Sequence, residues 1–178
     1  MWREGEAVRD RFESAQTFSE FLASAVENRE LWEEVYRRAR VPEAITGRAM
    51  VLRGAWRFLV LLEDWCVDAA SSIPYLVRLV DAVPVFELRL LTRDDNPDLM
   101  DTHLTGGSRS MPVVIILNED WQEVGWWGPR PAPLQDWFLR ELKPLPKPAR
   151  ARKIRGWYAR DQGETTLGEI LSRIPVLV

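Results

Sequence analysis

Apolar and polar positions follow a helical spacing at the start of the chain. Thr17 and Glu20 form a capping-box pattern ahead of a run in which apolar residues recur at helical intervals. Asn28 stands where it can cap a second helix, which is expected to end before Pro42. Residues 1–52 are therefore predicted to be a helical extension that packs on the rest of the chain.

The middle of the chain alternates short apolar runs with helical segments. Residues 58–62 form a continuous apolar run bounded by charge, which is typical of a strand buried on both faces of a sheet. From Asp68 the apolar spacing becomes helical, with Pro74 inside the segment, where it predicts a kink. Residues 85–91 form the next apolar run, so this order predicts a right-handed strand–helix–strand unit with parallel strands.

The following segments complete the predicted sheet. Pro97 occupies the favoured first position of a short helix, and residues 113–117 form a third apolar strand. A polar triplet at residues 118–120 turns the chain into a fourth strand at residues 122–127, which makes a hairpin. A helix is expected after Pro131.

The end of the chain is predicted to be an appendage. The alternating prolines of residues 143–148 indicate an extended connector, because proline disfavours the interior of a helix. Thr166 and Glu169 form another capping-box pattern, which predicts that a last short helix opens there.

The order of these elements predicts one α/β domain with a central four-stranded mixed sheet flanked by helices, and Val60 and Val114 in its interior strands. Residues 1–52 are the N-terminal helical extension, residues 53–142 the core, and residues 143–178 the proline-containing connector and C-terminal helix. The length of 178 residues fits a single domain with an ordinary hydrophobic core.

Composition narrows the class of protein. Apolar residues make up 46% and charged residues 29%, which excludes a disordered or fibrous chain. The net charge is −3 with basic and acidic residues interspersed, so no nucleic-acid partner is expected. The longest apolar run is too short to cross a bilayer and the N-terminus lacks a signal-peptide core, so we expect a cytoplasmic protein without membrane contact.

Cys66 is the single cysteine and His103 the single histidine of the chain. An intramolecular disulfide is therefore excluded, and so is a structural zinc site built from cysteine and histidine. No metal and no cofactor are expected. His103 is interpreted as a solvated cap at the end of a helix rather than as a catalytic base.

Cys66 lies in the turn between the first predicted strand and the helix that follows it. A helix N-terminus presents unpaired amide hydrogens and a partial positive charge, which favour a thiolate. Glu63, Asp64 and Asp68 act the other way, because nearby negative charge raises the pKa of a thiol. Two interpretations stay open: Cys66 is a nucleophile, or it is a small apolar residue of the core.

Several motifs carry a family resemblance. They are Glu63-Asp64-Trp65-Cys66-x-Asp68-Ala69, Gly107-x-Arg109-Ser110-x-Pro112, Trp127-Gly128-Pro129-Arg130-Pro131 and Trp157-Tyr158-Ala159-Arg160-Asp161. Together with Pro74 they resemble the thioredoxin superfamily, and most closely a bacterial branch with Trp-Cys-x-Asp-Ala (WCxDA) in place of the usual pair of cysteines. The resemblance implies a thioredoxin-like fold in which a loop with a cis bond before Pro112 lies against Cys66 and hydrogen-bonds extended substrates.

The chain departs from working thioredoxins at two positions. Ala69 stands where the family has its resolving cysteine, and Val60 where it has a buried acid for proton transfer. One hypothesis is single-cysteine thiol–disulfide exchange through Cys66, with an external small thiol as the resolving group. The alternative is a non-catalytic binding or scaffold module that uses the groove around Trp65 and Pro112. The expected partner is a protein disulfide, a peptide or a small thiol.

The resemblance also suggests which residues surround Cys66. The candidate binding residues are Trp65, Asp68, Arg109, Ser110, Met111, Pro112 and Arg130. Arg109 and Arg130 would clamp an anion beside the thiol, or would pair with acidic residues of the chain. Trp65, Trp126 and Trp127 would form an aromatic platform, although core positions are the more common role of tryptophans near a strand end.

Overall fold

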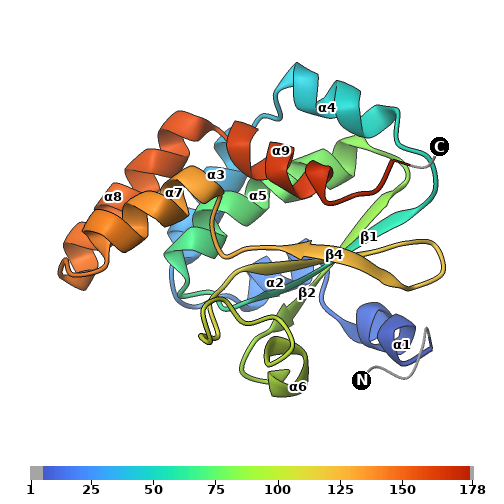
Figure 1. The fold of residues 1–178 in the computed structure, drawn as a ribbon, viewed down its shortest axis with the longest axis horizontal. Helices are drawn as coiled ribbons and strands as arrows, with labels where there is room; N and C mark the ends of the chain where they lie inside the picture. Colours follow the sequence, from blue (N-terminus) through green and yellow to red (C-terminus); the bar gives the residue numbers. More distant parts are fainter. Residues whose placement is uncertain (1–5, 177–178) are drawn as a thin grey trace.

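The chain folds around one mixed sheet (Figure 1). The structure is a computed structural model that describes residues 6–176. The four strands are β1 (Trp56–Leu62), β2 (Phe86–Thr92), β3 (Val113–Leu117) and β4 (Glu123–Trp127), in the order β2-β1-β3-β4. β1 is parallel to β2 and antiparallel to β3, and β3 and β4 form an antiparallel hairpin. The predicted four-stranded mixed sheet is confirmed.

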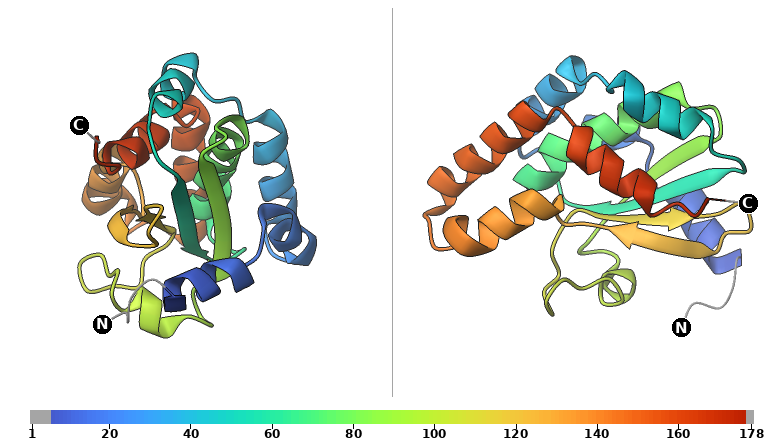
Figure 2. Two further views of the ribbon diagram at one scale, coloured as in Figure 1. Left: turned by 90° about the vertical axis from the view of Figure 1, so that its right-hand side faces the viewer. Right: turned by 45° about the horizontal axis from the view of Figure 1, so that its top comes forward.

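β1 and β3 are the interior strands, as predicted. Val60 of β1 lies opposite Val114 of β3, and every residue of β3 is buried. Successive side chains of a strand point to opposite faces. Val60 therefore joins a core cluster with α5 and α9, whereas its neighbours Leu59 and Leu61 join a second cluster with α1 and α6. Residues 58–62 of β1 and residues 113–117 of β3 are continuous apolar runs because helices cover both faces of the sheet (Figure 2).

The described part of the N-terminal extension holds four helices, two more than predicted. They are α1 (Glu6–Ser14), α2 (Phe18–Ser24), α3 (Arg29–Arg38) and α4 (Glu43–Met50). The capping box of Thr17 and Glu20 is present, with both reciprocal hydrogen bonds. The capping role predicted for the Asn28 side chain is wrong. Asn28 precedes α3 but has a left-handed backbone (φ 55°) instead of the extended one that a capping side chain needs.

The helices of the core match the predicted order. α5 (Val67–Ala82) connects the parallel strands and contains Pro74, and α6 (Pro97–Met100) begins with proline at its first turn. α7 (Ala132–Trp137) runs into a π-helical segment, η1 (Phe138–Leu142). The structure offers no helix in its described residues that is both long and apolar enough to cross a membrane.

The predicted extended connector at residues 143–148 is wrong. Residues 143–146 make a turn, and Lys147 and Pro148 begin the long helix α8 (Lys147–Asp161). Proline is compatible with this position because the first helical turn has no intrahelical partner for the missing N–H. Figure 1 shows α8 lying beside α7, and the two helices share a small core with η1.

The last helix, α9 (Glu164–Ser172), begins before Thr166. Thr166 is fully buried inside it, so the capping role predicted for this residue is wrong. The Asp161 side chain instead accepts hydrogen bonds from the backbone N–H of Thr165 at 3.1 and 3.2 Å. The carboxylate of Asp161 satisfies this terminus from the preceding helix, which frees Thr166 for the core.

Candidate functional site

Cys66 is the N-cap residue of α5, immediately after β1. Its Sγ accepts a hydrogen bond from the N–H of Ala69 at 3.5 Å, and its thiol donates to the carbonyl oxygen of Met111 at 3.6 Å. The side chain is buried, with 8% of its surface exposed. A thiol that donates to a carbonyl is protonated, so this geometry holds Cys66 in its neutral form.

The electrostatic environment agrees with a neutral thiol. Burial, and then the negative charge of Asp68, raise the pKa of Cys66 to about 12. The amide of Ala69 and the charge of Arg130 act in the opposite direction but are outweighed. At pH 7 such a thiol is almost entirely protonated.

Asp68 forms a buried cluster with Arg130 and Tyr158. Arg130 binds both carboxylate oxygens, through Nε at 3.0 Å and Nη2 at 2.9 Å, and the Tyr158 hydroxyl donates to Oδ1 at 3.0 Å. The guanidinium also lies 3.8 Å from the ring centroid of Phe138 and donates to Gln135. The cluster therefore joins α5, the segment before α7, and α8. Burial raises the pKa of Asp68, and its ion pair with Arg130 opposes that shift.

The loop before β3 lies against Cys66, as the resemblance implied. The Met111-Pro112 peptide bond is cis, Met111 is buried, and the Met111 carbonyl is the group that contacts the thiol. Gly128 packs on this loop with φ 136°, and a Cβ there would collide with the carbonyl oxygen of Pro112. Glycine is therefore required at position 128 for the chain after β4 to approach the loop.

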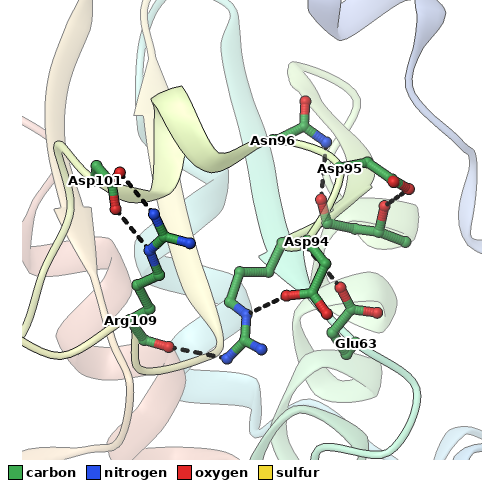
Figure 3. A network of polar contacts seen from close by, with 8 residues as sticks. Glu63, Asp94, Asp95, Asn96, Asp101 and Arg109 are labelled. Atoms are coloured by element: carbon green, nitrogen blue, oxygen red, sulfur yellow. Dashed lines mark hydrogen bonds and ion pairs between the residues drawn. The ribbon is translucent and has the colours of Figure 1, made fainter.

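Arg109 does not reach the thiol. Its guanidinium forms a bidentate ion pair with Asp101 at 2.7 and 2.8 Å, and both side chains are about half exposed. Figure 3 shows this pair, together with the carbonyl of Arg109, which accepts a hydrogen bond from Arg93. Of the two alternatives for these arginines, the structure shows the pairing with acidic residues of the chain: Asp101 binds Arg109, and Asp68 binds Arg130.

Glu63 belongs to the same surface network in Figure 3, where its carboxylate accepts a hydrogen bond from the backbone N–H of Asp94 at 2.9 Å. Partial burial raises the pKa of Glu63. This contact ties the end of β1 to the loop after β2, so the Glu63 carboxylate is bound at that loop.

The three tryptophans do not form one platform. Trp127 is buried in the core, with its Nε1 donating to Glu169 at 2.8 Å. Trp65, by contrast, keeps 38% of its surface exposed next to Cys66, and the Arg93 guanidinium lies 5.2 Å from its ring centroid. Trp126 is partly buried against His103. Trp65 is thus the most exposed of the three tryptophans.

His103 is not a solvated cap. It is 2% exposed, its Nδ1 lies 2.8 Å from the Leu99 carbonyl oxygen, and its Nε2 lies 3.0 Å from Glu123. Burial lowers the pKa of His103, but the hydrogen bonds with Glu123 and Leu99 together raise it above its ordinary value. β4 supplies the partner that the sequence did not reveal.

Tyr158 and Glu169 are two further polar side chains that hold the site and that sequence reasoning did not single out as partners. Tyr158 lies within the motif at residues 157–161, which was the available signal. Glu169 accepts hydrogen bonds from Trp127 and from the backbone N–H of Ala132 at 2.8 Å. In the part of the chain that the structure describes, no group of three or more potential ligands could hold a metal ion.

Comparison with known proteins agrees with this architecture. Residues 15–148 match a family model described as Thioredoxin. Among solved structures, the chain is similar to a protein of unknown function from Pseudomonas aeruginosa, with a TM-score of 0.73 and 21% identity over 91% of this chain and 93% of that one. It is also similar to an HIV epitope scaffold, with a TM-score of 0.71 and 19% identity over 93% of this chain and 95% of that one. At these identities the two structures report on the fold alone. The search of curated proteins finds no match.

Proposed function

Because this chain belongs to the thioredoxin family, we propose that it is a binding module that holds an extended protein segment in the groove around Trp65 and Pro112 without turnover. The observation that carries the proposal is the state of Cys66. Its thiol donates to the Met111 carbonyl and has its pKa raised to about 12, so it is a poor nucleophile at neutral pH.

Two further features support binding rather than turnover. Ala69 stands in the position of a resolving cysteine and is fully buried, and Val60 stands in the position of the proton-relay acid. Trp65 offers an exposed aromatic surface beside the loop of Ser110 and Met111, and such surfaces are common anchors for protein partners.

A second candidate is single-cysteine thiol–disulfide exchange. The hydrogen bond from the Ala69 N–H to Sγ favours it, because the start of α5 directs a donor at the sulfur. In this reaction the Cys66 thiolate attacks a disulfide, forms a mixed disulfide and releases one partner as a thiolate. An external thiolate then attacks the Cys66 sulfur of the mixed disulfide, which releases the second partner as a thiolate and leaves Cys66 disulfide-bonded to the external thiol. A second external thiolate attacks that disulfide, which frees the Cys66 thiolate and leaves the two external thiols joined as a disulfide.

One experiment separates the two functions. We expect the protein, supplied with dithiothreitol, to reduce the disulfides of insulin no faster than dithiothreitol alone. We also expect folded Cys66 to react with a small aromatic disulfide far more slowly than the unfolded chain does. Rapid insulin reduction that disappears in Cys66→Ser would establish exchange and reject the binding module.

Binding is tested with a displayed library of extended peptides. Peptides selected on the intact protein should bind Cys66→Ser with unchanged affinity and Trp65→Ala at least about tenfold more weakly. Leu139→Ala is the matched control, because Leu139 is a large exposed apolar residue on η1. Equal losses in the two alanine variants would reject the groove as the binding site.

A further inference from the structure

A hollow of about 780 Å³ lies between α3, α5 and α8. α5 contacts both of the other helices, so the hollow sits in the angle that they form against it. Its size falls within the range of small-molecule sites, roughly 300–1,000 Å³. Trp65 and Pro112 do not line the hollow, although Tyr158, which binds Asp68 in the candidate site, does.

The inner wall of the hollow is apolar except for a serine. Leu31 and Val35 of α3 and Tyr75 of α5 supply the apolar surface. Ser71 of α5 lines the same wall with 4% of its surface exposed, and its hydroxyl has no hydrogen-bond partner among the residues that the structure describes. Buried hydroxyls are nearly always hydrogen-bonded, so the unpartnered Ser71 hydroxyl is a group that a polar ligand atom entering this wall would satisfy.

The rim of the hollow is strongly basic. Its lining includes the arginines Arg38, Arg40, Arg152 and Arg155, against the single acid Glu34. Glu34 is already paired with Arg38 at 3.0 Å. Arg152 and Arg155 of α8 have no acidic partner within residues 6–176. In a chain whose net charge is −3, this local excess of positive charge attracts an anion.

We propose that this hollow binds a small organic acid with an apolar body. The carboxylate or phosphate head lies among the arginines of the rim, where charge-assisted hydrogen bonds are strongest. The apolar body covers Leu31, Val35 and Tyr75, and an oxygen on that body hydrogen-bonds Ser71. A basic rim alone would suit any anion, whereas the apolar wall and the buried hydroxyl select an amphipathic one.

Isothermal titration calorimetry of the full chain with terminally hydroxylated decanoate tests the proposal. We expect saturable binding, with decanol and inorganic phosphate at least about tenfold weaker because each lacks one half of the ligand. Inorganic phosphate that binds as tightly as the hydroxy acid would reject the apolar half of the site. A hexaglutamate peptide that binds while the hydroxy acid does not would reject the proposal in favour of an acidic protein segment.

Matched variants locate the site. Arg152→Gln with Arg155→Gln should weaken binding of the hydroxy acid at least about tenfold. Lys153→Gln with Arg160→Gln removes the same charge from the same helix at residues that line a different hollow, and should change it little. Equal losses of affinity in the two double variants would show that the net charge of α8, and not this hollow, controls binding, and would overturn the proposal.

Ser71→Ala adds a readout that does not depend on charge. This variant should bind the hydroxylated acid several-fold more weakly and plain decanoate with unchanged affinity, without a loss in the free energy of unfolding. If this variant bound the hydroxylated acid with unchanged affinity, Ser71 would not be part of the binding site. Because neither Trp65 nor Pro112 lines this hollow, its failure would leave the proposed function untouched.

Discussion

Asp68 is a carboxylate that the fold buries beside a thiol. Its two oxygens are bound by Arg130 and Tyr158, and its charge raises the pKa of Cys66. One side chain thus has two effects: it fixes the segment before α7 through Arg130, and its charge adds to the burial that raises the pKa of the neighbouring thiol. A negative charge at this position disfavours the thiolate, which is the form that a nucleophilic cysteine needs.

The variant Asp68→Asn should separate these two effects. Removing the charge lowers the pKa of Cys66, and it leaves the buried guanidinium of Arg130 without its counter-ion. We expect the free energy of unfolding to fall by about 3–5 kcal/mol, the usual cost of breaking a buried pair from one side. Urea denaturation measures the loss, and thiol reactivity against pH measures the shift. Asp120→Asn is the control, since Asp120 is an exposed residue on the turn between β3 and β4. A stable Asp68→Asn variant with unchanged thiol reactivity would contradict this account.

His103 gives a pH dependence with a definite sign. Its pKa is raised in the folded protein, so its charged form stabilises the fold below the ordinary value of about 6.5. That contribution is lost as the pH rises through the raised pKa. Glu123→Gln should lower the pKa of His103 and make the free energy of unfolding fall less steeply as the pH rises. Glu119→Gln on the adjacent turn should do neither. Because the chain has one histidine, a single NMR titration follows it directly, and an unchanged midpoint in Glu123→Gln would reject the assignment.

At the scale of elements, the sequence was most informative about the strands that are buried on both faces. β1 and β3 are such strands, so their apolar runs could be recognised without knowing which elements pack against them. α8 was missed because only Ile154 and Tyr158 of its residues are buried, and the rest of the helix reads as a polar, arginine-rich segment. Thr166 was misread for a related reason. A capping-box pattern is local, whereas the residue that satisfies this helix start, Asp161, lies in the preceding helix.

The turn between α8 and α9 depends on a glycine. Gly163 has φ +79°, and a Cβ there would lie 2.5 Å from Cδ1 of Tyr75. Gly163→Ala should therefore lower the free energy of unfolding by about 1–3 kcal/mol. Gly47→Ala is the control: Gly47 lies inside α4 with no atom near its added Cβ, and the change should stabilise by about 0.5–1 kcal/mol. Urea midpoints measure both, and a stabilised Gly163→Ala would show that the turn is not constrained by Tyr75.

At the scale of the molecule, the candidate site is assembled from segments far apart in the chain. Cys66 comes from the start of α5, Met111 from the loop before β3, Arg130 from the segment before α7, and Tyr158 from α8. The motifs of the sequence marked each segment, and the family resemblance predicted that the first two meet. The partners of the two arginines could not be predicted, because Asp101 and Asp68 are two of many acids and only the fold chooses between them.

The C-terminal helix α9 packs into the same core cluster as the interior strands of the sheet. Leu167, Ile170 and Leu171 of α9 are buried in the cluster that contains Val60 and Val114. Burying three such side chains contributes about 5–9 kcal/mol, which is comparable to the whole stability of a domain, about 5–15 kcal/mol. Glu169 adds two hydrogen bonds, to Trp127 and Ala132. We therefore expect that the domain cannot be divided at the proline-containing turn.

A truncation after Leu142 tests this conclusion. The shortened chain loses α8 and α9, uncovers the part of the core on which α9 packs beside β4, and leaves Asp68 without its Tyr158 partner. We expect it to lack a cooperative unfolding transition, while the full chain unfolds in one step with the same midpoint by tryptophan fluorescence and by far-UV circular dichroism. Leu139→Ala in the full chain, which alters an exposed residue close to the truncation point, should keep the single transition. Two separate transitions in the full chain, or a truncated chain that unfolds cooperatively, would show that the sheet is stable without its C-terminal helices.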